Sequence, residues 1–325
     1  MDRVKITNTE LETASLSLGT VGFGTARSRE EAFEQMDLYT DEGGNFLDTA
    51  LVYGDWACDE AGCSERVIGE WMARKKNRSE IILSTKGCHP PIDDMNVSRV
   101  RGRLIHEDVE KSLRNLRTDY IDLYFLHRDD ESVCVGELLE ALEEEVRKGN
   151  IRYYGCSNWS TGRIRQAAEY AAAHGLQGFS CNQVMFSLAD IDPETLSATR
   201  MMALDEEGYQ YHRETGMALM AYMCQAGGYF YKRLAGRPLS EGARRQYDCP
   251  SNDRILEKLE KLTREGWDVN DFIYAFVRQV PFPAIPIAAF GSRSQLEQGL
   301  KSADRKVPDV LLRELAECKQ RQIYR

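Results

Sequence analysis

The sequence lacks a hydrophobic run long enough to cross a membrane, and it has no excess of positive charge. No uninterrupted apolar stretch of its 325 residues approaches the about 18 residues that a spanning helix needs. Its 42 Lys and Arg stand against 52 Asp and Glu, so the formal net charge of −10 repels nucleic acid and anionic lipid. The N-terminus also lacks the apolar core of a signal peptide. We therefore expect a cytoplasmic protein with no membrane or nucleic-acid partner.

The cysteines do not form the pattern of a disulfide-rich domain. Their number, nine, is odd, and their scattered positions indicate a reduced protein. Cys58 and Cys63, followed by Cys88 and His89, could mark a metal site, but the two paired clusters of a structural zinc site are missing. We expect ordinary buried or loop thiols here and no bound metal.

The composition is that of a folded chain, with 42% hydrophobic and 29% charged residues. Domains of about 150 residues would allow two units, whereas a strand–helix barrel occupies about 250 residues as one. No linker, composition break or internal repeat divides the sequence. We predict a single domain over residues 1–325.

Short apolar runs alternate with helical patterns along most of the chain. Candidate strands cover residues 18–24, 45–49, 81–86, 121–127, 151–156, 179–182, 217–222 and 284–287. Candidate helices lie near residues 29–43, 64–76, 106–117, 136–148, 160–174, 194–215 and 252–265. About eight such units favour an α/β protein with a closed (β/α)8 TIM barrel. Residues 4–6 and 16–18 predict a separate β-hairpin before the barrel.

Residues 224–251 resist assignment because they are rich in glycine and proline and show little periodicity. The segment is a basic island on an acidic chain, with Lys232, Arg233, Arg237, Arg244 and Arg245. Long loops in compact domains are often functional. Two interpretations stay open: a solvated loop, or a lid that covers phosphate groups.

Ionisable side chains end three successive candidate strands. Asp48, Lys86 and His127 each follow an apolar run, and Tyr53 lies five residues after Asp48. Taken singly, Asp48 could cap a helix, Lys86 could be a surface residue and His127 a core imidazole. In a barrel, however, the C-terminal strand ends converge on one face, so the set predicts an active site.

Four motifs around these residues resemble the aldo-keto reductase superfamily. They are Asp48-Thr49-Ala50-x-x-Tyr53-Gly54, Ser84-Thr85-Lys86, Asp119-Tyr120-Ile121-Asp122-Leu123-Tyr124-x-x-His127 and Lys148-Gly149-x-Ile151-Arg152-x-x-Gly155-x-Ser157-Asn158-Trp159. The resemblance implies a (β/α)8 barrel with an N-terminal β-hairpin closing its bottom and long loops at its C-terminal face. It also implies metal-free hydride transfer between NADPH and an aldehyde or ketone.

By this resemblance, Tyr53 is the general acid, Lys86 and Asp48 tune it, and His127 orients the carbonyl. A free tyrosine has a pKa of about 10. A cation about 4 Å away contributes roughly 4 kcal/mol at an effective dielectric of about 20. We therefore expect Lys86 to lower the pKa of Tyr53 by up to about three units, towards neutral pH.

The resemblance also implies a cofactor site. Ser157, Asn158 and Gln183 match residues that bind the nicotinamide amide, and Tyr222 matches the aromatic that stacks on its ring. The other expected cofactor residues are Thr25, Asp48, Met223, Gln225, Ser292, Arg293 and Gln298. Gly291 to Ser294 resembles a loop for the 2′-phosphate, but two registers beyond it are open: one brings Glu297 and Lys301 to the cofactor, the other Gln295, Gln298 and Gly299. NADP is favoured, with NAD as the competitor.

The substrate pocket is expected in the loops at residues 51–63, 87–104, 128–134 and 224–251 and in the C-terminal tail. Candidate lining residues are Trp56, His89, Arg128, Trp159 and Tyr229. The polar run Arg128 to Asp130 indicates a hydroxylated, sugar-derived carbonyl compound, or alternatively a loop ion pair or cap.

We thus predict an NADP-dependent reductase of a small aldehyde or ketone. The rival hypothesis is a regulatory protein that keeps the fold and binds the cofactor with little turnover. A third, a metal-dependent barrel hydrolase, would need metal ligands at the strand ends. The oligomeric state is left open.

Overall fold

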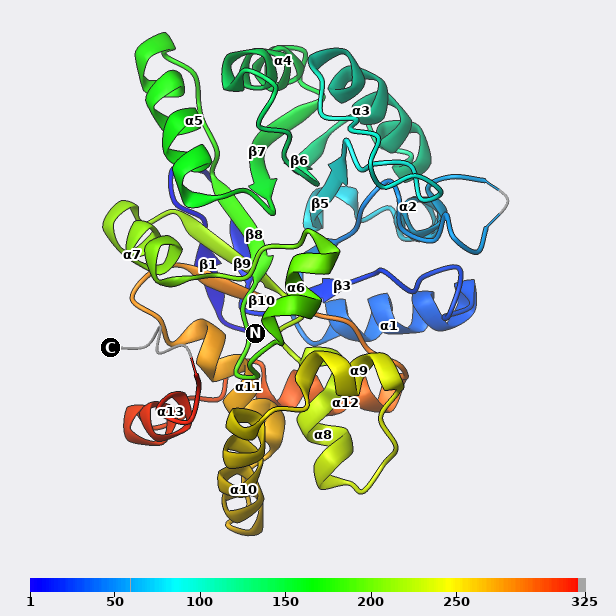
Figure 1. Ribbon diagram of the computed structural model, residues 1–325. Coiled ribbons are helices and arrows are strands. Elements are labelled where there is room, and N and C mark those ends of the chain that lie inside the picture. The colour runs from blue at the N-terminus through cyan, green and yellow to red at the C-terminus, as the bar shows by residue number, and fades with distance from the viewer. Residues whose placement is uncertain (59, 321–325) are drawn as a thin grey trace.

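The computed structural model describes residues 1–58 and 60–320, and at its centre is a closed barrel of parallel strands (Figure 1). The barrel strands are β3 (Ser17–Gly19), β4 (Phe46–Asp48), β5 (Ile82–Gly87), β6 (Ile121–Leu126), β7 (Ile151–Ser157), β8 (Cys181–Met185), β9 (Ala218–Tyr222) and β10 (Ala284–Ala288). Strands consecutive in sequence are neighbours, and β10 closes the ring by pairing with β3, Ile287 opposite Ser17. The predicted (β/α)8 barrel is confirmed.

The strands are buried on both faces, which explains their apolar runs. In β6, Leu123 and Phe125 belong to the cluster inside the barrel, whereas Tyr124 and Leu126 pack in the larger cluster beneath the helices. Because side chains alternate across a strand, one apolar run supplies both layers.

An antiparallel hairpin of β1 (Arg3–Lys5) and β2 (Glu12–Ala14) precedes the barrel. Ile6 and Leu11, at its turn, join the cluster inside the barrel, so the hairpin plugs one end. The expectation that residues 16–18 form its second strand was wrong. The turn at Asn8, with φ of 58°, reverses the chain early, and residues 17–19 are free to enter the barrel as β3.

Helices surround the barrel (Figure 1). They include α1 (Arg29–Asp41), α2 (Cys63–Lys75), α3 (Gly102–Leu116), α4 (Val135–Arg147), α5 (Thr161–His174), α10 (Pro250–Arg264), α11 (Val269–Arg278), α12 (Arg293–Ser302) and α13 (Asp309–Ala316), with a short 3-10 turn, η1 (Arg78–Glu80). In α3 the buried side chains Ile105, Val109 and Leu116 recur on one face.

The continuous helix expected over residues 194–215 was also wrong. The structure has α6 (Pro193–Thr199) and α7 (Glu206–Thr215) instead. Arg200 ends α6 with a left-handed φ of 54°, and the Asp205 side chain accepts a hydrogen bond from the Gly208 backbone to begin α7. The break sends residues 201–203 past the top of the barrel, where Met201 lines the main cavity.

The unassigned segment 224–251 is an ordered structure rather than an irregular loop. It contains η2 (Ala226–Gly228), α8 (Tyr229–Leu234) and α9 (Glu241–Tyr247). The hydroxyl of buried Tyr229 donates to Asp248 over 2.9 Å, which ties α8 to the end of α9. Across residues 1–58 and 60–320, no helix combines the length and apolarity that a membrane crossing requires.

Candidate active site

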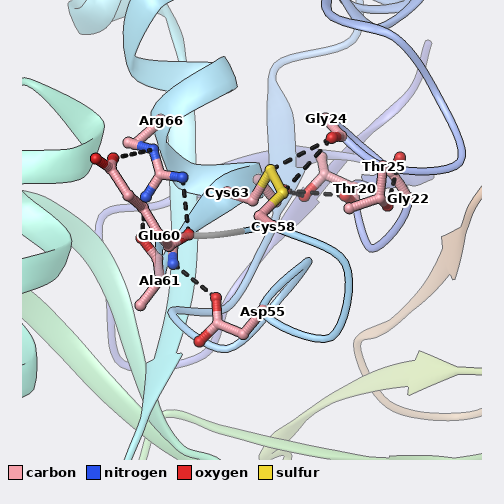
Figure 2. The surroundings of a disulfide bond; sticks show 12 residues. Thr20, Gly22, Gly24, Thr25, Asp55, Cys58, Glu60, Ala61, Cys63 and Arg66 are labelled. Atoms are coloured by element: carbon pink, nitrogen blue, oxygen red, sulfur yellow. Dashed lines mark hydrogen bonds and ion pairs between the residues drawn. A yellow bond between two sulfur atoms is a disulfide. The ribbon is translucent and has the colours of Figure 1, made fainter.

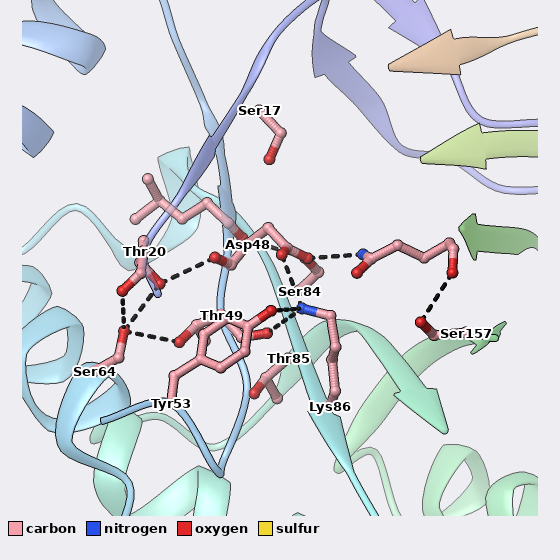
Figure 3. Close-up of polar contacts among 12 residues, drawn as sticks. Ser17, Thr20, Asp48, Thr49, Tyr53, Ser64, Ser84, Thr85, Lys86 and Ser157 are labelled. Carbon is pink, nitrogen blue, oxygen red and sulfur yellow. Dashed lines mark hydrogen bonds and ion pairs between the residues drawn. The ribbon is translucent and has the colours of Figure 1, made fainter. Parts of the chain in front are cut away.

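The four residues singled out at the strand ends lie together in space. Asp48 is the last residue of β4, Lys86 is in β5, His127 follows β6, and Tyr53 is on the loop after β4. The Lys86 Nζ atom lies 2.8 Å from Asp48 Oδ2 and 3.3 Å from the Tyr53 hydroxyl (Figure 3). It also donates to the Thr49 carbonyl over 2.6 Å. One ammonium group therefore joins a carboxylate and a phenol at the open end of the barrel.

The second oxygen of Asp48 is fully engaged. Its Oδ1 atom accepts from Ser84 Oγ at 2.7 Å and from Gln183 Nε2 at 2.9 Å. Asp48 and Lys86 expose only 2% and 1% of their surface. A buried ion pair persists when additional hydrogen bonds satisfy it, and this pair has partners from β5, from β8 and from Thr49, which follows β4. Neither Ser84 nor the Gln183–Asp48 contact was foreseen as part of this network.

Burial and charge set the protonation of Lys86 and Tyr53. Burial lowers the pKa of Lys86, but Asp48 and Tyr53 outweigh it, so its pKa is raised and the ammonium form holds. Burial raises the pKa of Tyr53 by more than the Lys86 charge lowers it, so its net pKa lies above the ordinary value. The expected lowering of the Tyr53 pKa was therefore wrong in direction, because it omitted the cost of burying a phenolate.

His127 presents a neutral imidazole beside Tyr53. Burial, followed by the Lys86 charge, holds the pKa of His127 well below its usual value. Its ring lies edge-on to the Tyr53 ring with centroids 6.0 Å apart, and the His89 ring is 4.8 Å away. Its Nδ1 atom is buried with no partner among the described residues. A neutral imidazole can donate one hydrogen bond to a bound oxygen without adding a second charge.

A cavity of about 680 Å³ opens over these groups, and its lining extends from them to α12. Asp48, Tyr53 and His127 line one end, and Gln295 and Gln298 of α12 line another part of it. Of the expected cofactor residues, those among the described lining are Asp48, Ser157, Asn158, Gln183, Tyr222, Met223, Gln225 and Gln298. A cavity of this size accommodates an extended organic ligand.

The remaining expected cofactor residues lie off the cavity. Thr25 donates to the Gly22 carbonyl over 3.2 Å, and Arg293 pairs with Glu297 over 3.0 Å on the exposed side of α12. Ser292 caps this helix by accepting from the Gln295 backbone. The structure thus has the register with Gln295 and Gln298 towards the cavity, because the helix begins at Arg293.

The cavity's chemistry fits a dinucleotide. Amide side chains gather at the end near His127: Asn158 Nδ2 donates to the His127 carbonyl over 3.2 Å, and its Oδ1 accepts from Tyr222 over 2.6 Å. Elsewhere the lining has Gly227 and Gly228, with φ of 61° and 77°, and a Cβ atom added to Gly227 would meet no atom within 4 Å. Exposed backbone of this kind, with Lys232 and Arg237 in the lining, suits phosphate groups.

The expected substrate residues are not all near this cavity. Arg128 lines it, and His89 touches the His127 ring. Trp56 is 53% exposed, whereas Trp159 and Tyr229 are buried, with Trp159 Nε1 donating to the Arg128 carbonyl. These three are absent from the described lining. Residue 59 and tail residues 321–325, also placed by sequence in pocket loops, lie outside the described residues.

Lining residues that sequence reasoning missed include Met201, Tyr231, Asn270, Ile273 and Phe290. Met201 stood inside the incorrectly continuous helix, and Asn270 and Ile273 are on α11, which was not predicted. The sequence singled out Lys232 and Arg237 as part of the basic segment 224–251, but it did not predict that they line the cavity. The signal that could have found α11 is the capping box of Asp268 and Asp271 ahead of an apolar run.

A disulfide joins Cys58 to Cys63 beside the active-site loop (Figure 2). The expectation of free thiols at these positions was wrong. The loop folds back on itself, with the Gly62 backbone donating to Asp55 over 2.7 Å, and this reversal brings the two cysteines together. The backbone N–H of Ser64, directly after Cys63, donates to the Tyr53 carbonyl over 3.1 Å.

In the described part of the chain, no group of three or more His, Cys, Asp or Glu could hold a metal.

Comparisons with known proteins identify the family of the chain. The family model for the aldo/keto reductase family matches residues 15–320. The uncharacterized oxidoreductase YrpG of Bacillus subtilis is 30% identical, covering 97% of this chain and 95% of its own. Norsolorinic acid reductase B of Dothistroma septosporum is 30% identical, covering 84% and 69%.

A solved structure shares the fold. It is the holo form of aldo-keto reductase AKR11C1 from Bacillus halodurans, with a TM-score of 0.74 and 24% identity, covering 100% of this chain and 98% of that one. The closed barrel, the polar residues at its strand ends and the match across residues 15–320 lead to one conclusion. The chain belongs to the aldo/keto reductase family, and it is an NAD(P)-dependent oxidoreductase.

Proposed function

We propose that this chain reduces a small aldehyde or ketone to an alcohol with NADPH, as a single-domain cytoplasmic enzyme with Tyr53 as the proton donor. The observation that carries the proposal is the contact of Lys86 Nζ with the Tyr53 hydroxyl, at 3.3 Å, where Tyr53 lines the cavity. A small sugar-derived carbonyl compound is compatible with the polar lining near His127.

The side chains have distinct tasks in this reaction. A bound reduced nicotinamide supplies the hydride. Tyr53 starts protonated because burial raises its pKa, and it gives its proton to the carbonyl oxygen as negative charge grows there. Lys86 stabilises the phenolate that forms, and Asp48 keeps Lys86 charged and fixed. His127 orients the carbonyl by donating a hydrogen bond to the same oxygen.

Other residues of the cavity would hold the cofactor. Ser157, Asn158 and Gln183 would bind the nicotinamide amide, and Tyr222 would pack on its ring. The open backbone at Gly227 and Gly228, with Lys232, would receive the phosphates. We propose NADP rather than NAD, because Glu297, the carboxylate that would repel a 2′-phosphate, is engaged by Arg293. Fluorescence titration tests this preference: NADPH should bind at least about tenfold more tightly than NADH, and equal affinities would contradict it.

The rival function is a regulatory protein that binds the cofactor and turns over little. The complete set of Asp48, Tyr53, Lys86 and His127 favours the enzyme, because a buried ion pair aimed at a phenol has no evident use in cofactor binding alone. Consumption of NADPH with a panel of small aldehydes separates the two. Turnover with several aldehydes is the expected result, and NADPH binding without consumption of any of them would support the rival.

A further inference from the structure

Arg128 is a cation that has no counter-ion among the described residues, and it lies next to the reacting groups. It follows His127 directly and lines the same cavity as Tyr53 and His127. Its Nη1 atom donates to the Arg200 carbonyl over 3.0 Å, and its Nε atom is buried with no partner among residues 1–58 and 60–320. The partner it does have is a neutral carbonyl, so its charge is left uncompensated.

The acidic residues near Arg128 are committed elsewhere. Asp129 pairs with Arg163 at 3.3 Å, and Asp130 pairs with Arg101 at 2.9 Å. The loop ion pairs that the sequence allowed therefore form, but Arg128 takes no part in them. Asp48 is the one acid in the described cavity lining, and Lys86 holds it at 2.8 Å. A half-buried guanidinium in such surroundings favours an incoming anion, because its desolvation is otherwise uncompensated.

The position of Arg128 distinguishes it from the other cations of the cavity. Lys232 lies beside the open backbone of η2, with its Nζ atom 2.9 Å from the Gly227 carbonyl, and Arg237 follows α8. The charge of Arg128 instead acts on Tyr53 and Tyr222, since it lowers the pKa of both against the stronger effect of burial. Cofactor phosphates would thus meet Lys232, which leaves Arg128 for the substrate.

We propose that the carbonyl substrate carries an anionic group, a carboxylate or a phosphate, and that Arg128 pairs with this group and so selects the substrate. The proposal rests on the proposed function and names its substrate class. The carbonyl carbon gains a hydride from NADPH, the oxygen gains the Tyr53 proton, and the anionic group is unchanged. The product is a hydroxy acid or a hydroxyalkyl phosphate. Sugar-derived acids and phosphates belong to this class.

The test uses matched pairs of aldehydes that differ in charge. Succinic semialdehyde is compared with its methyl ester, and glycolaldehyde phosphate with glycolaldehyde, so that the two pairs distinguish carboxylate from phosphate. The wild-type chain should favour the anionic member of at least one pair by about tenfold or more in kcat/KM. Arg128→Gln should lower the ratio of kcat/KM for the anionic over the neutral member of that pair by about tenfold to a hundredfold, because any effect of the lost charge on Tyr53 is common to both members.

Two further variants separate charge selection from damage to the fold. Arg128→Lys keeps the charge but not the planar fork, and it should restore part of the preference. Arg264→Gln is the matched control: the Arg264 side chain is exposed on α10, where it pairs with Glu260 over 2.6 Å away from the cavity lining, and its loss should change neither substrate by more than about threefold. NADPH affinity should stay within about threefold in all three variants.

The outcomes are distinguishable. If the wild-type chain reduces neutral aldehydes with the same kcat/KM as their anionic partners, the proposed anion site is wrong and the reductase function stands. An equal loss on both members of a pair in Arg128→Gln also overturns the anion site. If NADPH binds and no aldehyde of either kind is reduced, the proposed function fails, and the anion site fails with it.

Discussion

Lys86 and Asp48 form a buried ion pair, 2.8 Å between Nζ and Oδ2, and the Tyr53 hydroxyl connects this pair to the cavity above it. The pair costs desolvation energy, and its hydrogen bonds to Ser84, Gln183 and the Thr49 carbonyl offset that cost. The pairing of Lys86 with Asp48 therefore affects the stability of the fold, and the contact of Lys86 with Tyr53 affects the activity.

Removing Lys86 should destabilise the fold and stop turnover. In Lys86→Met the Asp48 carboxylate is left buried without a cation, so we expect a loss of about 3–5 kcal/mol in the free energy of unfolding. The double variant Lys86→Met with Asp48→Asn removes the orphaned charge and should recover most of that stability, but not the activity. Urea unfolding and aldehyde reduction measure the two effects. A double variant as unstable as the single one would show that the ion pair is not the source of the loss.

The rate of carbonyl reduction should depend on pH in the way that a protonated phenol requires. The pKa of Tyr53 lies above its ordinary value because burial outweighs Lys86, so the acid form persists across neutral pH. We expect kcat for reduction to stay level from about pH 6.5 to pH 9 and to fall only in more alkaline solution, above the ordinary tyrosine pKa of about 10. A fall in kcat centred between about pH 7 and pH 8 would indicate that Lys86 dominates instead.

Acidic solution should lower stability through the buried imidazoles. Burial lowers the pKa of His127 and of His212, so the unfolded chain binds protons at these sites before the folded chain does. The two imidazoles do not affect stability above the histidine pKa of the unfolded chain, about 6.5, and they lower stability increasingly as the pH falls below it. The free energy of unfolding should therefore decrease from about pH 7 to pH 5, and His212→Gln should flatten part of that slope. A slope unchanged in this variant would contradict the assignment.

The disulfide should be visible in a thiol count. Seven of the nine cysteines are free, so unfolded protein without reductant should react at seven thiols, and reduced protein at nine. Cys58→Ser with Cys63→Ser should lower the free energy of unfolding by roughly 2 kcal/mol, because the closed loop is short. Serine at Cys134, an exposed free cysteine, is the control and should have little effect on stability. Nine reactive thiols without reductant would show that the pair is open in solution.

The barrel and the cluster of Asp48, Lys86 and His127 could be predicted because both follow from local pattern. Apolar runs ending in a polar residue define parallel strands, and barrel closure brings their ends together whatever the loops do. Tyr53, five residues beyond a strand end, was reached through its motif rather than through periodicity.

The features that were predicted wrongly or left open depend on contacts that no local sequence pattern encodes. The helix break at Arg200 depends on a left-handed backbone conformation, which an arginine in the sequence does not indicate. The Cys58–Cys63 bond depends on how the loop between the two residues folds back. The direction of the Tyr53 pKa required its burial, which only packing supplies. The turn of Glu297 away from the cavity depended on where α12 begins.

The most direct measurement is the kinetics of Tyr53→Phe, with Tyr170→Phe as a matched control on α5, where the half-buried Tyr170 ring carries a hydroxyl that donates to Glu140. The substituted ring would keep the shape of the site but carry no hydroxyl proton. We expect kcat for aldehyde reduction to fall by about a hundredfold to ten-thousandfold while the dissociation constant for NADPH changes by less than about threefold. The Tyr170→Phe variant should match the wild-type chain. Undiminished turnover in Tyr53→Phe would contradict the account, because the proton would then come from another group.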